Sequence, residues 1–79
     1  VYTVPLYGGT QHLIHEFLEP FGITGIAVRA GQTEALAQTI AETNNLRIVF
    51  IETPANPTLV MTDIRHAANA AKAHPDKPL

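Results

Sequence analysis

The stretch Leu46–Thr58, LRIVFIETPANPT, decides the fold. Its first half, Leu46–Ile51, is β-branched and aromatic and shows no strict alternation after Arg47. This pattern is typical of a strand that is covered on both faces, as in a parallel sheet between helices. The second half contains Pro54 and Pro57, which fix their own φ angles and disfavour the helical conformation at the residues before them. The sequence therefore predicts a buried strand that continues into a stiff, extended loop.

This loop is a candidate ligand site, because ligands of open α/β sheets bind at the carboxyl ends of the strands. It carries a carboxylate, Glu52, and a carboxamide, Asn56, which are suited to hold polar groups of a ligand. The same two prolines also suit a strand that simply stops and turns. The spacing of these residues leaves both interpretations open.

A short strand and an amphipathic helix are predicted before this stretch. Val1–Leu6 is a short apolar segment that Pro5 limits in length, and Tyr7–Thr10 is a tight turn with Thr10 as the N-cap of the helix. The apolar face of that helix consists of Leu13, Ile14, Phe17, Leu18 and Phe21. Pro20 and Gly22 end it, with Gly22 in a left-handed position.

A second strand, Ile23–Val28, and two further helices complete the prediction. The second helix has Thr33 as its N-cap and ends at Asn44. Its predicted buried stripe consists of Leu36, Ala37, Ile40 and Ala41. The third helix begins after Thr62 or Asp63. Its predicted packing face consists of Ile64, Ala67, Ala68 and Ala71.

The alternation of strands and helices indicates an α/β fold with a parallel sheet and right-handed crossovers. A doubly covered parallel sheet usually needs more chain than 79 residues, and both ends read as interior sequence. We therefore expect residues 1–79 to be one segment of a larger domain. A net charge of −2 argues against a nucleic-acid partner. The absence of cysteine fits a reducing compartment, and the sequence has no apolar run long enough for a membrane span and no basic-then-apolar leader.

Several residues carry candidate chemistry, each with a simpler alternative. Gly8–Thr10 opens a helix and could hold an anion, although a turn with an N-cap explains it equally, and neither a Walker lysine nor a GxGxxG motif is present. His12 and His15 beside Glu16 could share a metal, but solvated helix histidines explain them without a third ligand, and the same holds for the remaining histidines. Tyr7 could stack on a planar ligand or be an ordinary core tyrosine.

The motifs together resemble one enzyme family. LYGGT at Leu6–Thr10, FGI at Phe21–Ile23, IETPANPT at Ile51–Thr58 and TDI at Thr62–Ile64 occur in the order typical of the Cys/Met-metabolism family of pyridoxal-phosphate enzymes. That family comprises cystathionine γ-synthases, cystathionine lyases, methionine γ-lyases and O-acylhomoserine sulfhydrylases. The resemblance extends over nearly the whole chain, and its most specific element is E-[ST]-P-x-N-P. Gly9 departs from the cysteine typical of methionine γ-lyases, which disfavours that member.

The resemblance implies a segment of the large domain of a fold-type I enzyme, a three-layer sandwich around a parallel sheet. It implies that Tyr7 stacks on the pyridine ring of pyridoxal 5′-phosphate and assists proton transfer, and that Asn56 donates to the phenolic oxygen of this cofactor. Glu52 matches a carboxylate at the rim of the site. It further implies a sulfur-containing or O-acylated amino-acid substrate, elimination or replacement at the β or γ carbon, a cytoplasmic location and a homotetramer built as a dimer of dimers.

Much of the machinery of that family lies outside this sequence. The Schiff-base lysine, the aspartate of the pyridine nitrogen and the glycine-rich phosphate turn have no counterpart, and neither Lys72 nor Lys77 is in a setting that would activate an amine. We therefore expect the 79 residues alone to be inactive. A non-catalytic α/β scaffold or interaction module remains the alternative function.

Overall fold

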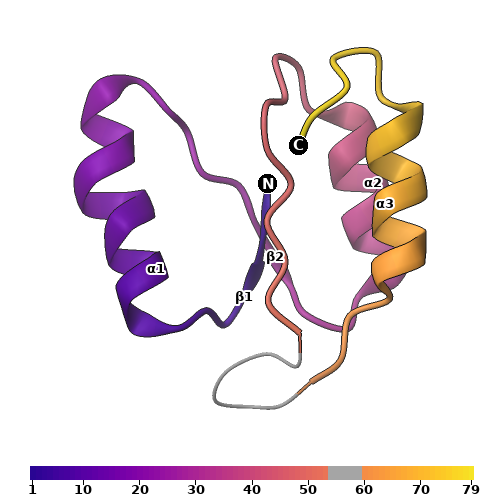
Figure 1. Ribbon diagram of the computed structural model, residues 1–79, viewed down its shortest axis with the longest axis horizontal. Helices are drawn as coiled ribbons and strands as arrows, with labels where there is room; N and C mark the ends of the chain where they lie inside the picture. Colours follow the sequence, from indigo (N-terminus) through magenta and orange to yellow (C-terminus); the bar gives the residue numbers. More distant parts are fainter. Residues whose placement is uncertain (54–59) are drawn as a thin grey trace.

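The computed structural model describes residues 1–53 and 60–79 (Figure 1). The elements in chain order are β1 (Tyr2–Val4), α1 (Gly8–His12), η1 (Leu13–Leu18), η2 (Glu19–Phe21), β2 (Ala27–Arg29), α2 (Thr33–Glu42) and α3 (Ile64–Ala73). α1, η1 and η2 follow one another without a break, with α-, π- and 3₁₀-type hydrogen bonding in turn. The predicted proline loop, including Pro54, Asn56 and Pro57, lies outside the described residues.

β1 is an interior strand with a parallel neighbour on each edge. On one edge it pairs with β2, with Thr3 opposite Val28. On the other edge Tyr2 forms a parallel bridge with Phe50, and the Thr3 N–H donates to the Phe50 carbonyl at 3.1 Å. The predicted parallel pairing is therefore observed among the described residues.

The last residue adds a further parallel position beyond residues 48–50. The Leu79 N–H donates to the Arg47 carbonyl at 2.9 Å, and the Leu79 carbonyl accepts from the Val49 N–H at 2.7 Å. Bonds to two residues on either side of a single partner are the parallel pattern. The spatial order is therefore β2, β1, residues 48–50 and Leu79.

Helices lie on both sides of these strands. In Figure 1, α1 stands on one side and the adjacent α2 and α3 on the other. The core fills the space between the strands and α2 and α3, and its buried members are Val28, Leu36, Ile40, Leu46 and Ala67. Ile40 is fully buried and Leu36, one helical turn earlier, is 3% exposed, so α2 contributes an apolar stripe at the expected spacing. Burial of each such side chain is worth about 1.5–3 kcal/mol.

Two of the three strand predictions need correction. The segment 46–51 forms an isolated parallel bridge at Phe50 and is not a continuous strand. Within these 79 residues it is not covered on both faces, because Ile48 and Phe50 are 52% and 39% exposed. The predicted strand Ile23–Val28 is also misplaced, since β2 starts at Ala27 and ends at Arg29. Its extent is set by its partner, because β1 offers pairing positions only to the residues opposite Tyr2–Val4.

The predicted helix starts are partly wrong. Thr10 is not an N-cap, because the helix begins at Gly8 with Tyr7 at the N-cap. Thr33 is the first residue of α2 and forms no capping bond. The helix therefore begins one residue earlier than predicted. Asp63 does cap α3, since its carboxylate accepts the His66 N–H at 3.0 Å. Gly22 adopts the predicted left-handed conformation, with φ at 87°.

The predicted helix faces are only partly observed. On α2, Ala41 is exposed. On α3, Ile64 is 61% exposed and Ala68 is also exposed, while Ala70 packs against the core instead. The apolar face of the first helix is the largest departure, because Phe17 is 54% exposed.

The first helix makes one contact with β1 and one with the segment that precedes β2. The buried Tyr2 donates or accepts a hydrogen bond with His15 Nε2 at 3.0 Å, and His15 Nδ1 lies 3.0 Å from Glu19 Oε1. At Gly25, a Cβ atom would lie 2.8 Å from Ile14 Cγ2, so the missing side chain permits the helix to approach. Among residues 1–53 and 60–79, no helix has the length and apolar character needed to cross a membrane.

Candidate functional site

The order in which the chain adds strands to the sheet reverses between β1 and residues 48–50. The chain leaves β1 through α1 toward β2, and it leaves residues 46–51 through α3 toward Leu79, which lies at the opposite side of the strand order. α1 and α3 lie on opposite sides of the strands (Figure 1). This is a topological switch point, and ligands of open parallel sheets bind outside the carboxyl ends of the strands there. The residues at these two carboxyl ends include Tyr7 and Glu52.

Glu52 joins the two carboxyl ends. Its Oε2 accepts the backbone N–H of Tyr7 at 2.9 Å, and its Oε1 accepts the Thr10 hydroxyl at 3.5 Å. The Glu52 N–H donates to Thr3 Oγ1 at 3.4 Å, which attaches the same residue to β1. A carboxylate at the first turn of a helix is favoured by the free N–H groups and by the helix dipole. Glu52 therefore satisfies the N–H of the N-cap residue Tyr7, as the carboxylate of a capping box does.

The Tyr7 ring is open to solvent. The residue is 60% exposed, and its hydroxyl has no hydrogen bond to the described residues. The core-tyrosine interpretation is therefore wrong for Tyr7. Its backbone is held at the switch point while its ring is available for a flat partner, so ring stacking on a ligand remains a prediction.

Asn56 lies outside the described residues, so its predicted position beside Tyr7 stays a prediction. The residues that flank the proline loop are nevertheless connected to each other. The Thr62 N–H donates to Thr53 Oγ1 at 2.9 Å. Since Thr53 follows Glu52, both Thr53 and its partner Thr62 lie near the carboxyl ends of β1 and residues 48–50.

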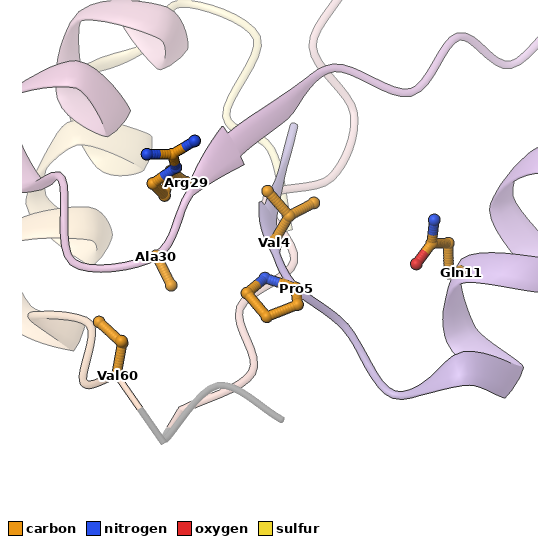
Figure 2. A pocket seen from close by; sticks show the side chains of 6 residues that line it. All are labelled: Val4, Pro5, Gln11, Arg29, Ala30 and Val60. Carbon is orange, nitrogen blue, oxygen red and sulfur yellow. The ribbon is translucent and has the colours of Figure 1, made fainter. Parts of the chain in front are cut away.

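A hollow lies where β1 and β2 end (Figure 2). Its volume is about 440 Å³, within the range typical of small-molecule pockets. It is lined by Val4, Pro5, Gln11, Arg29, Ala30 and Val60. The apolar residues form most of this lining, and Gln11 and Arg29 are its polar members. The sequence did not indicate this hollow, because its residues come from four separate parts of the chain.

His12, His15 and His74 have side-chain contacts. His12 packs its ring against Phe17 at 5.5 Å between centroids, and His15 is bonded as described above. His74 is 5% exposed, which makes its interpretation as a solvated histidine wrong. In the described part of the chain, no group of three or more His, Cys, Asp or Glu residues is placed to hold a metal ion.

Comparison with known proteins finds one matching family and several relatives whose names agree with it. The family described as Cys/Met metabolism PLP-dependent enzyme matches residues 1–77. A cystathionine beta-lyase of Staphylococcus haemolyticus is 38% identical over 69 residues, 87% of this chain and 17% of that protein. A cystathionine gamma-lyase of Rattus norvegicus is 35% identical over 71 residues, 90% of this chain and 17% of that protein. An L-methionine gamma-lyase of Brevibacterium aurantiacum is 36% identical over 67 residues, 85% of this chain and 15% of that protein. The chain thus spans less than a fifth of the length of these relatives.

Proposed function

Because the chain belongs to the family of Cys/Met metabolism PLP-dependent enzymes, we propose that it is part of the large cofactor-binding domain of such an enzyme. The complete protein would eliminate or replace the β or γ substituent of a sulfur-containing or O-acylated amino acid. The similarity to cystathionine and methionine lyases supports this substrate class.

The residues present fit a flat aromatic cofactor. The observation that carries the proposal is the solvent-open Tyr7 ring, whose backbone Glu52 holds at a topological switch point. Pyridoxal phosphate, when bound, supplies an electron sink for the substrate. Tyr7 would hold the cofactor through its ring, and its hydroxyl would hold or transfer a proton. Asn56 would bind the phenolic oxygen of the cofactor through its amide N–H and so favour the anionic form of that oxygen. Glu52 would be at the rim of the site.

The proposal includes the architecture of the complete protein. The arrangement of α1 on one side of the parallel strands and α2 and α3 on the other supports a three-layer sandwich. We place the protein in the cytoplasm, which suits a sequence without cysteine. We also propose that the complete protein is a homotetramer assembled as a dimer of dimers. The 79 residues alone should be inactive.

The site assignment is tested in the complete protein by substitution of the two proposed cofactor contacts. Asn56→Ala should shift the visible absorption of the bound cofactor, and Tyr7→Phe should reduce kcat. Asn44→Ala and Tyr2→Phe make the same chemical changes away from the carboxyl ends of the strands, and both should keep the parent spectrum. If Asn56→Ala and Tyr7→Phe matched the parent in spectrum and rate, the assignment would be wrong.

A second experiment addresses the isolated segment. Titration of pyridoxal phosphate into the 79-residue chain, followed by absorption and equilibrium dialysis, should show no tight, stoichiometric binding. Stoichiometric binding would contradict the proposal that the cofactor site needs residues outside this segment.

A further inference from the structure

We propose that Glu52 is a positioning residue, which fixes the direction of the Tyr7 ring and acts on the cofactor only through it. This inference rests on the proposed function, because it assigns Tyr7 a cofactor to contact. A residue in contact with the cofactor would act on it through its charge. Glu52 instead acts through the length and direction of its side chain, which fix the position of the Tyr7 backbone.

The first argument is the target of the Glu52 hydrogen bonds. Both carboxylate oxygens point at the first turn of α1, with Oε2 on the Tyr7 N–H at 2.9 Å and Oε1 on the Thr10 hydroxyl at 3.5 Å. The Tyr7 N–H bond spans 45 residues of sequence, so it joins two separate elements. The group that Glu52 holds is thus the backbone of the very residue whose ring is open to a ligand.

The second argument is that Glu52 ties this turn to the strands. Tyr7, at the N-cap, provides no side-chain capping bond of its own. Its carbonyl accepts the N–H groups of Thr10 and Gln11 at 3.0 and 3.2 Å, but these bonds stay within the first helix and do not reach the strands. A Cβ atom at Gly8 or Gly9 would meet nothing within 4 Å among the described residues, and glycine gives the backbone wide conformational freedom. Without Glu52, the described residues would offer the Tyr7 backbone no hydrogen bond to the strands.

The third argument is that Glu52 is itself well anchored. Its N–H donates to Thr3 Oγ1 at 3.4 Å, and Thr3 is 1% exposed within β1. The preceding residues pair with β1 through the bridge between Tyr2 and Phe50. Glu52 therefore transmits the fixed position of the sheet to the start of α1, as a supporting residue must.

Two conservative variants of the complete protein distinguish the effect of the length of the Glu52 side chain from the effect of its charge. Glu52→Gln keeps the length of the side chain and an oxygen that accepts the Tyr7 N–H, but it removes the charge. Glu52→Asp keeps the charge and shortens the reach by one methylene. We expect Gln to keep kcat/KM within about threefold of the parent, and Asp to lose about tenfold to a hundredfold, the size typical of a misplaced group. The opposite order, with Asp near the parent and Gln impaired, would overturn the inference.

A readout without catalysis accompanies the kinetics. In the cofactor-free protein, hydrogen exchange of the peptide that spans residues 7–13 should be faster in Glu52→Asp than in the parent, and unchanged in Glu52→Gln. In the loaded protein, the circular dichroism of the cofactor band should change in Glu52→Asp. Equal exchange and equal dichroism in all three proteins would show that Glu52 does not position this turn.

A double-mutant cycle tests whether Glu52 acts through Tyr7. Glu52→Asp should have less than a twofold effect on kcat/KM once Tyr7→Ala has removed the ring. Independent, multiplicative losses would overturn the inference while leaving the proposed function intact. If Tyr7→Ala alone left the cofactor spectrum and the rate unchanged, the proposed function would be the part that fails.

Discussion

Replacement of His74 by phenylalanine should loosen the contact between the C-terminal ends of α2 and α3. The imidazole is buried, with its side chain 4% exposed. Its Nδ1 accepts the Asp76 N–H at 3.0 Å, so the other ring nitrogen, Nε2, carries the hydrogen and donates to the Thr43 carbonyl at 2.7 Å. The Asp76 carboxylate accepts the Leu46 N–H at 2.9 Å, which extends the network to the start of the strand segment.

The expected cost follows from the two backbone groups that His74→Phe leaves without a partner. Phenylalanine preserves the ring but has no polar atom, so the Thr43 carbonyl and the Asp76 N–H each lose a bond. An unsatisfied buried group costs about 1–3 kcal/mol. Because Thr43 is only half-buried and Asp76 is largely exposed, we take the lower part of that range for each. The opening free energy of this region should fall by about 2–3 kcal/mol in total.

Hydrogen exchange followed by mass spectrometry of the complete protein measures this change locally. A loss of about 2–3 kcal/mol corresponds to exchange about 30- to 150-fold faster in peptides that contain Leu46 and Asp76. His66→Phe is the matched control, since the His66 ring has no hydrogen bond within the described residues. It should change exchange less than threefold. Equal exchange in the two variants would refute the proposed network.

Three further substitutions test the core, a cap and a turn. Ile40→Ala, at a fully buried position, should lower the free energy of unfolding by about 2–4 kcal/mol in urea titrations, and a loss below 1 kcal/mol would contradict its central place in the core. Asp63→Ala removes the cap on the His66 N–H and should cost about 1 kcal/mol by the same measurement, with Asp63→Asn largely restoring it. Gly31→Ala should cost about 1–3 kcal/mol in thermal unfolding, because φ at Gly31 is +85° and the new Cβ would lie 2.7 Å from Val60 Cγ1.

Features encoded by near neighbours in the sequence were predictable. The buried positions Leu36 and Ile40 follow from helical spacing, and Asp63 follows from the preference of carboxylates for the N-cap. The left-handed Gly22 follows from the absence of a side chain. In each case the signal and the structure lie within one or two helical turns of each other.

Features that depend on distant residues were not predictable. Glu52 binds the N-cap residue of α1 and the Thr10 hydroxyl, and no local pattern around Thr10 indicates a carboxylate 42 residues away. The apolar pattern of residues 46–51 predicts two covered faces, yet Ile48 and Phe50 stay partly exposed. The first helix contacts Tyr2 of β1 and Gly25, which precedes β2. Only the tertiary structure defines these contacts.

The position of β1 between two later segments has a kinetic consequence. β1 precedes its partners on one edge, residues 48–50, by a long stretch of chain, and the bond from the Val1 nitrogen to the Ile48 carbonyl spans 47 residues. Closing so long a loop costs chain entropy before the pairing is gained, and such non-local contacts slow folding. β1 should therefore stay unpaired on that edge until the two intervening crossovers have formed.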